Sequence, residues 1–224
     1  SEQHGEPFAD AANVPLFEMC QALNNKIKVV LQGDGGDELF GGYNRHRLIK
    51  VSSVVSALAN LLNNIFPEML RKYQRLDRLA DIFTANNGIR LALMMTMEQR
   101  TNSPFRILSN EYHDHLCETT SPFLAYLNAF EKFGDLGQET CIFMSDLTTQ
   151  LPSQFLTKVD RASMAASVEA RVPLLDERLL DLAISIPPKI RTSMFKAKRL
   201  LYLSQKERLP KMVLRGPKKG FGTP

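Results

Sequence analysis

The chain has few cysteines and little net charge, and each of these features excludes certain classes of protein. Its 224 residues include three cysteines, widely spaced and without a Cys-x-x-Cys pair, which argues against a disulfide scaffold and favours a reducing, cytoplasmic location. The formal net charge is +4, and basic residues gather only near the C-terminus, so we expect no nucleic-acid partner. We find no signal peptide and no apolar run long enough to span a bilayer, so we expect no membrane partner.

What is present indicates a globular protein. With 44% hydrophobic and 23% charged residues, the chain can bury a sizeable core in one large domain or two small ones. It starts at Ser1 without a methionine and stops just after the sequence PKKGFG. We therefore expect a fragment or an excised domain.

Helical periodicity dominates, with one strand candidate. Residues 27–31 (IKVVL) form a short β-branched run before glycine, and the apolar run predicts a strand buried on both faces, as in parallel sheets. Residues 48–66 are predicted to form a core helix, and a helix break is predicted at Leu151 and Pro152. Further helices are predicted over residues 15–24, 68–83, 89–100, 122–133, 140–150, 159–168 and 176–186.

The strand leads into a stretch rich in glycine and acid. Residues 29–43 read VVLQGDGGDELFGGY, with five glycines and three carboxylates. A calcium-binding EF-hand is excluded, since Gly36 and Leu39 stand where an oxygen ligand and the turn glycine are needed. The calcium-binding β-helix repeat needs several stacked copies, and this chain has one. A plain surface turn and a site for magnesium and phosphate remain.

The position of this stretch favours the second of these interpretations. A buried strand followed by a glycine nest and a helix marks the carboxyl edge of an α/β sheet, where ligands bind. Backbone N–H groups there attract anions, and the helix start adds its dipole. Asp34 and Asp37 lie in the same turn and could hold Mg²⁺, which uses few carboxylates and completes its shell with phosphate oxygens. Carboxylates that could hold Mg²⁺, together with backbone amides that attract anions, suit a polyphosphate ligand.

Several blocks in a fixed order resemble the asparagine synthase family. The GDGGDELFGGY stretch is similar to that family's signature. Residues 151–176, LPSQFLTKVDRASMAASVEARVPLLD, and residues 215–224, RGPKKGFGTP, resemble two further family segments, and EPFADAANVP resembles its substrate-side loop. The resemblance covers essentially the whole chain.

The resemblance implies a nucleotide-binding α/β domain of the ATP-pyrophosphatase type, of which this fragment would be a mostly α-helical part with one or two parallel strands. Such enzymes use ATP and Mg²⁺ to turn aspartate and glutamine-derived ammonia into asparagine, with AMP and pyrophosphate as products. The family's first phosphate loop, Ser-Gly-Gly-x-Asp-Ser, and its N-terminal glutamine amidotransferase domain are absent from residues 1–224. The resemblance thus implies that the fragment alone is inactive and that the full-length protein could form a homodimer.

Residue roles follow from the same resemblance. Asp37 would be a Mg²⁺ ligand, and Asp34 stands where the family has an acid implicated as a base in amide formation. Lys218 aligns with a lysine that stabilises pyrophosphate and the charge developing at the reacting carbonyl. Lys219 would take that role if the alignment shifts by one position.

Three glycines would shape the nucleotide pocket, and three positions depart from the family pattern, one of them Gly216, which is inserted in the common Arg-Pro-Lys-Lys segment. Gln32 replaces the usual serine or threonine, and Tyr202 stands where many relatives have arginine. The pocket glycines are Gly33, Gly35 and Gly36.

Charged residues between apolar ones form another candidate group. They could brace a helix against the sheet as buried ion pairs, or they could contact substrate. The group comprises Lys158, Asp160, Arg161, Glu169 and Arg171.

Two alternative functions stay open. The same adenylation chemistry could act on another carboxylate, giving a sugar-linked amide, a β-lactam or a cyclic peptide. The domain could also be a degenerate one retained for assembly, although intact Asp34, Asp37 and Lys218 argue against decay.

Overall fold

The computed structural model describes residues 10–66, 72–96 and 109–216, together with Gly5, Phe8 and Leu70. The chain divides into two compact units. The first comprises Ser1–Gly42 and Gln150–Pro224, and the second comprises Tyr43–Thr149.

The first unit contains a small parallel sheet. Strand β1 (Val29–Leu31) pairs with β2 (Glu169–Arg171), with Val29 opposite Glu169 and Leu31 opposite Arg171. The prediction of a mostly helical chain with one or two parallel strands is confirmed for the described residues. The strand predicted at residues 27–31 is shorter than expected.

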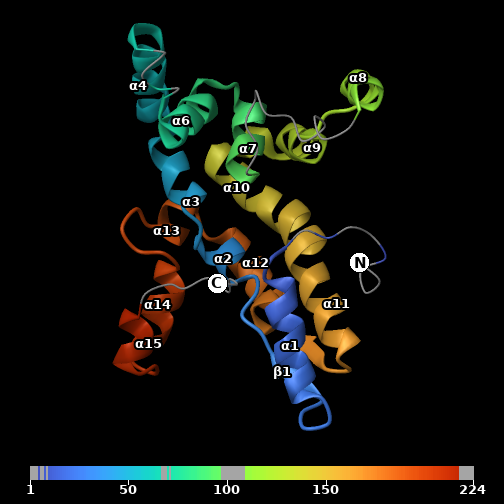
Figure 1. Cartoon of the computed structure of the whole chain (residues 1–224). Coiled ribbons are helices and arrows are strands. Elements are labelled where there is room, and N and C mark those ends of the chain that lie inside the picture. The colour runs from blue at the N-terminus through green and yellow to red at the C-terminus, as the bar shows by residue number, and fades with distance from the viewer. Residues whose placement is uncertain are drawn as a thin grey trace. The chain divides into compact units, whose positions relative to one another are not determined.

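Two helices lie beside this sheet. Helix α1 (Asn13–Leu23) packs along α11 (Thr157–Ala165), which leads through a short turn into β2 (Figure 1). Cys20, Val159 and Ala162 are buried, so small and branched side chains form the seam that joins helix to sheet. These packed segments place the residues that follow β1 next to α11.

The remaining helices of the first unit are short. Both α12 and α14 pack against α2, which begins five residues after β1. At the start of α12, the side chain of Asp176 accepts a hydrogen bond from the Arg178 amide, as an N-cap should. The elements are α2 (Gly36–Phe40), η5 (Pro173–Leu175), α12 (Glu177–Ser185), α13 (Pro188–Arg191), α14 (Arg199–Gln205) and α15 (Lys211–Arg215).

The prediction that β1 is buried on both faces is wrong for the described chain. Val29 is 36% exposed and Leu31 75% exposed. The backbone bonds from Gln32 to Arg171 and from Glu169 to Lys28 fix the edge of β1 that faces β2. Because alternate strand residues turn their amides to opposite sides, Val29 and Leu31 present theirs to the other edge, where no described strand lies.

The second unit is a bundle of helices around one apolar core. Buried residues on α6, α7, α9 and α10, including Phe83, Leu93 and Ile142, form this core. Its elements are α3 (Arg45–Leu48), η1 (Ile49–Val51), α4 (Ser52–Ile65), α6 (Gln74–Thr84), α7 (Asn87–Met95), α8 (Asn110–Thr119), α9 (Leu124–Phe133), η3 (Gly134–Leu136) and α10 (Gln138–Ser145). Parts of the helices predicted at 68–83 and 89–100 lie outside the described residues.

The helix predicted to lie in the core over residues 48–66 has one exposed face, so the prediction is wrong for that face. Within α4, Ser52 is the buried residue, while Val54, Leu58 and Leu61 are exposed. Their spacing places them on one side of the helix. The opposite side packs against α6 and the core, so α4 has an apolar stripe on both sides.

The expectation of no membrane-length run also needs correction. The helical run Gly36–Ile65 covers 30 residues and is long and apolar enough to cross a membrane by length and composition alone. Gly41 interrupts it with a left-handed backbone, φ 71°. A single run of this kind is weak support for a membrane span, and the cytoplasmic location stays a prediction.

The break predicted at Leu151 and Pro152 is not found. Instead α10 continues into a π-helix, Asp146–Leu156, which contains Pro152 and runs on into α11. Proline clashes with the carbonyl four residues back in an α-helix. A π-helix pairs residues five apart in a wider turn, and this accommodates the ring.

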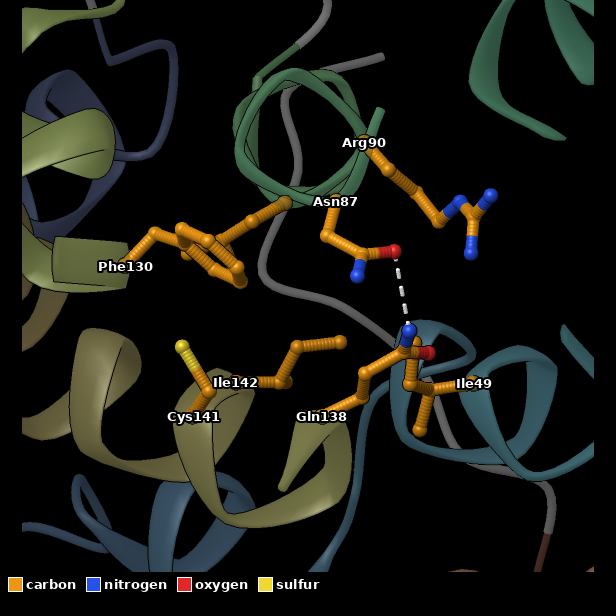
Figure 2. Close-up of a pocket in the computed structure, with 8 residues that line it drawn as sticks. Ile49, Asn87, Arg90, Phe130, Gln138, Cys141 and Ile142 are labelled. Atoms are coloured by element: carbon orange, nitrogen blue, oxygen red, sulfur yellow. Dashed lines mark hydrogen bonds between the residues drawn. The ribbon is translucent and has the colours of Figure 1, made fainter. Parts of the chain in front are cut away.

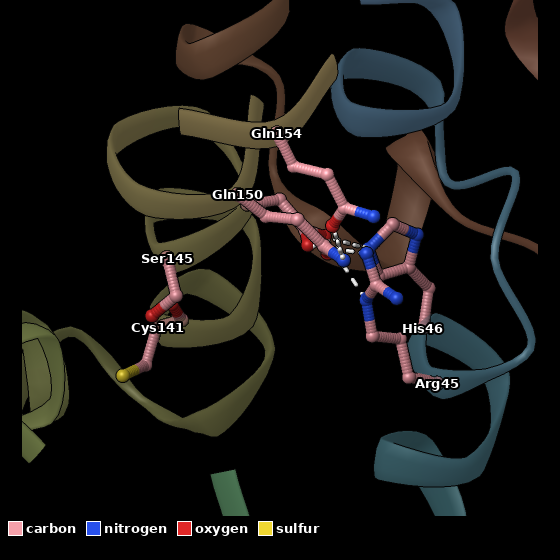
Figure 3. Close-up of polar contacts among 7 residues, drawn as sticks. Arg45, His46, Cys141, Ser145, Gln150 and Gln154 are labelled. Atoms are coloured by element: carbon pink, nitrogen blue, oxygen red, sulfur yellow. Dashed lines mark hydrogen bonds and ion pairs between the residues drawn. The ribbon is translucent and has the colours of Figure 1, made fainter. Parts of the chain in front are cut away.

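A buried carboxylate joins α3 to the start of the π-helix within the second unit. Asp146 accepts a 2.5 Å bond from Arg45 Nη2 and lies 2.6 Å from His46 Nε2 (Figure 3). The side chains of His46 and Asp146 are fully buried, and the imidazole stacks on Phe143 with ring centroids 4.3 Å apart. The segment that follows the acidic stretch is therefore held against the second unit's core by the contacts with Asp146 and by the packing of His46 on Phe143.

Candidate active site

The glycine- and acid-rich stretch lies where its sequence predicts. Asp34 follows the carboxyl end of β1, and Asp37 lies in the first turn of α2. Between them Gly35 adopts a left-handed backbone, φ 84°, that turns the chain from strand to helix. A strand, a glycine turn and a helix start therefore meet at one edge, as expected of an anion site.

Asp37 has a cationic partner that the sequence did not reveal. Lys198 Nζ lies 3.0 Å from Asp37 Oδ2, although the two residues are far apart in sequence. Lys198 precedes α14 and has a left-handed backbone, φ 51° and ψ 40°. Packing of α14 against α2 delivers the ammonium to the acid.

Asp34 is electrostatically distinct from Asp37. Burial raises the pKa of Asp34 above its usual range; Lys158 and Lys198 oppose this shift, and the charge of Asp37 adds to it. Its Oδ2 is buried with no hydrogen-bond donor among the described residues. A carboxylate held this way is a stronger proton acceptor than a solvated one, as a general base requires.

A cavity of about 470 Å³ opens beside Asp34. Lys158 and Gln32 also line it, and apolar residues of α1 and β1 form the rest of its wall: Ala12, Leu16, Met19, Cys20, Leu23, Val30 and Leu31. Asp37 is not among its lining residues. The two acids that lie in the same turn therefore do not line this cavity together.

Lys158 is anchored next to this cavity. Its Nζ donates a 3.0 Å hydrogen bond to Asp10 Oδ2, and both side chains are mostly buried. Burial alone would raise the pKa of Asp10, but hydrogen bonds from Lys158 and from the Ala12 amide hold it below its usual range. Asp10 thereby links the start of α1 to α11.

The alternative of buried ion pairs does not hold for Glu169 and Arg171 on β2. Arg171 Nε lies 2.6 Å from Glu169 Oε1, but both side chains are more than half exposed. These two residues are neighbours on the same face of one short strand, so their pair braces no helix against the sheet. Asp160 and Arg161 are exposed on α11.

Two of the three predicted pocket glycines meet side chains closely. A β-carbon on Gly35 would lie 2.7 Å from Leu175 Cγ, and one on Gly36 would lie 2.9 Å from Leu174 Cδ1. A β-carbon on Gly33 would meet nothing within 4 Å. The left-handed backbone requires glycine at Gly35, a side chain at Gly36 would have to displace the end of Leu174, and Gly33 has room for a side chain.

The donor set fits a magnesium ion that relies on its substrate. No group of three or more His, Cys, Asp and Glu side chains in the described part of the chain could enclose a metal. Asp37 already holds one cation, the Lys198 ammonium, and its negative charge contributes to the raised pKa of Asp34. Mg²⁺ is commonly bound by one or two carboxylates, with phosphates and water completing the shell.

Lys218 and Lys219 lie outside the described residues, so their predicted roles stay predictions. Tyr202 lies under the Lys196 ammonium in a cation–π contact.

A second cavity, in the helical unit, is not a substrate site. Its volume of about 10 Å³ has room for roughly one water molecule. Figure 2 shows Gln138 donating a 3.0 Å bond to Asn87 across it, with Cys141 and Phe130 nearby. Burial raises the pKa of the Cys141 thiol, which favours its protonated form. Cys20 and Cys141 are buried free thiols.

Comparison with known proteins identifies the family. The family model for asparagine synthase matches residues 2–224. The chain belongs to the asparagine synthase family. The glutamine-hydrolyzing asparagine synthetase 1 of Bacillus subtilis (strain 168) is 29% identical over 98% of this chain, and a putative glutamine-hydrolyzing asparagine synthetase of Mycobacterium bovis is 28% identical over 98%. A putative synthetase 2 of Methanocaldococcus jannaschii is 31% identical over 72%.

This asparagine synthase chain is short beside those relatives. It spans 34% of the Bacillus subtilis protein and 33% of the Mycobacterium bovis protein. No solved structure matches it.

Proposed function

We propose that the chain is part of an enzyme that forms an amide with ATP, converting L-aspartate and ammonia from glutamine into L-asparagine. The observation that carries this proposal is Asp34, a carboxylate with a raised pKa at the end of β1, beside Asp37 and between two lysines. Family membership over residues 2–224 supports the ligase class.

The residues suit the two steps of this chemistry. In the first, the aspartate side-chain carboxylate attacks the α-phosphorus of ATP, and pyrophosphate leaves. In the second, ammonia attacks the acyl carbon of β-aspartyl-AMP, AMP leaves, and Asp34 accepts the proton that nitrogen loses. Lys158 and Lys198 provide positive potential for the anionic reactants.

Mg²⁺ would be held at Asp37, with the remaining ligands from ATP, and would supply charge neutralisation for the phosphates. Gly35 and Gly36 would bring backbone amides close to the nucleotide, with Gly33 at the edge of the pocket. Lys218, or Lys219 in its place, would stabilise pyrophosphate.

The parent domain is proposed to be a larger α/β domain of the ATP-pyrophosphatase type. The uncovered edge of β1 and the exposure of Leu31 support a sheet with further strands, because two short strands are marginal alone. The small share of the relatives' length supports a glutamine amidotransferase domain and the first phosphate loop outside residues 1–224. A homodimer of the full-length protein stays a prediction.

The test is pyrophosphate release by the full-length enzyme, with aspartate or glutamate as acceptor. We expect aspartate-dependent release, and we expect Asp34→Asn to lower the formation of asparagine by about 10²-fold or more, the usual contribution of a general base. Release with a different carboxylate, and none with aspartate, would support the alternative acceptors instead. Absence of release with every carboxylate would support an assembly role. Residues 1–224 alone should bind ATP·Mg²⁺ weakly in calorimetry.

A further inference from the structure

The Lys198–Asp37 pair is built into the fold rather than left at a mobile surface. The Lys198 and Asp37 side chains are 30% and 23% exposed. A β-carbon on Gly42 would overlap the Asp37 carboxylate and would lie 2.8 Å from Lys198 Cε. The bare backbone of Gly42 therefore makes the space in which the two side chains meet.

The two oxygens of the Asp37 carboxylate have different neighbours. Asp37 Oδ1 lies against the Gly42 backbone, and Oδ2 is the oxygen that Lys198 holds at 3.0 Å. Lys198 reaches it from a left-handed backbone that lysine rarely adopts, so the surrounding structure imposes this direction. Lys196, two residues earlier, turns instead to the Tyr202 ring.

We propose that Lys198 is an internal competitor for the divalent cation at Asp37. A metal ion and an ammonium repel each other at contact distance, so a metal that takes Oδ2 must break the ion pair. The released ammonium stays near the metal and is then available to anionic groups of the nucleotide. The proposal rests on the proposed function in taking Asp37 as the metal ligand. It adds that metal affinity without nucleotide is held low by this chain's own lysine.

The experiment measures Mn²⁺ binding to the full-length enzyme by electron paramagnetic resonance, without nucleotide. Lys198→Met should tighten binding about two- to fivefold, the range expected when a partly exposed ion pair is removed. Lys196→Met removes the same charge two residues away and should change binding by less than about twofold. Lys198→Arg keeps the charge and the pairing and should resemble the wild type.

Asp37→Asn separates the two proposals. If it abolishes Mn²⁺ binding in both the wild-type and the Lys198→Met backgrounds, Asp37 is the ligand. If it leaves binding unchanged, the metal role of Asp37 fails. If Asp37→Asn abolishes binding but Lys198→Met does not tighten it, or tightens it no more than Lys196→Met, the competitor role is overturned while the metal site stands. Failure of Lys198→Met to bind Mn²⁺ at all also overturns it.

Discussion

Lys158 Nζ lies 3.0 Å from Asp10 Oδ2, so an ion pair joins α11 to the start of α1 beside Asp34. Lys158 lines the same cavity as Asp34, and its charge lowers the Asp34 pKa against the larger effect of burial. The pair therefore places a fixed cation near the proposed base.

Lys158→Met should move the acid limb of the pH–rate profile of the full-length enzyme to higher pH. Without the lysine charge, the Asp34 pKa rises further, and a base must be ionised to act. The measurement is kcat/KM for aspartate against pH. Lys158→Arg should restore the limb. A uniform loss of rate at every pH, with the limb unmoved, would mean that Lys158 only packs.

Asp34→Asn should stabilise the fold at neutral pH. Because the folded-state pKa of Asp34 is raised, its protonated form is favoured, and stability falls as pH rises through that pKa. Asparagine imitates the protonated acid, so the gain should be present at neutral pH and should vanish below the ordinary pKa of aspartate. Urea unfolding of the chain at both pH values checks this. A gain that persists in acid would show that charge is not its cause.

Gly35→Ala should destabilise the chain by about 1–3 kcal/mol, since alanine pays for a left-handed backbone and meets Leu175. Gly33→Ala is the matched control, because a β-carbon there meets nothing within 4 Å. It should be neutral or stabilise by about 0.5 kcal/mol. Chemical unfolding measures both. Equal losses in the two variants would contradict the assignment of the turn to Gly35.

Local sequence patterns predicted β1, α1 and the acidic turn. Contacts between residues distant in sequence depend on packing, and local patterns could not predict them. The β-branched run before Gly33 indicated β1, and the proline and asparagine signals located α1. Nothing local could indicate that Lys198 reaches Asp37, because that contact depends on how α14 packs against α2. Periodicity also could not show that α4 leaves Leu58 exposed. An apolar helix has the same sequence pattern whether other elements cover one of its faces or both.

The β2 strand shows that the burial of a charged residue could not be predicted from the sequence alone. Glu169 and Arg171 alternate with apolar neighbours and looked like buried partners, yet both side chains face solvent. Lys158, from the same cluster, is mostly buried and paired with Asp10, a residue distant in sequence. Burial of a charge depends on what packs over it, and only the three-dimensional arrangement supplies this.

Lys218→Ala should lower kcat of the full-length enzyme by about 10²- to 10³-fold and should raise the KM for ATP far less. The expectation comes from the family resemblance, since Lys218 lies outside the described residues. A cation that contacts charge developing in the transition state affects kcat, whereas one that only binds ATP affects KM. Steady-state kinetics with Lys219→Ala as the control separates the two. A normal kcat in Lys218→Ala would move the role to Lys219.

Asp146→Asn should cost about 3 kcal/mol of unfolding free energy. The fully buried carboxylate accepts from Arg45 and contacts His46, and removing its charge leaves the Arg45 cation without its counter-ion. Asparagine keeps the shape, so the loss reports charge rather than a cavity. Asp135→Asn, at an exposed position of the same helical unit, should change stability by less than about 0.5 kcal/mol. Urea unfolding of the chain compares them. A loss below about 1 kcal/mol for Asp146→Asn would mean that neutral hydrogen bonds suffice there and that the charge adds little.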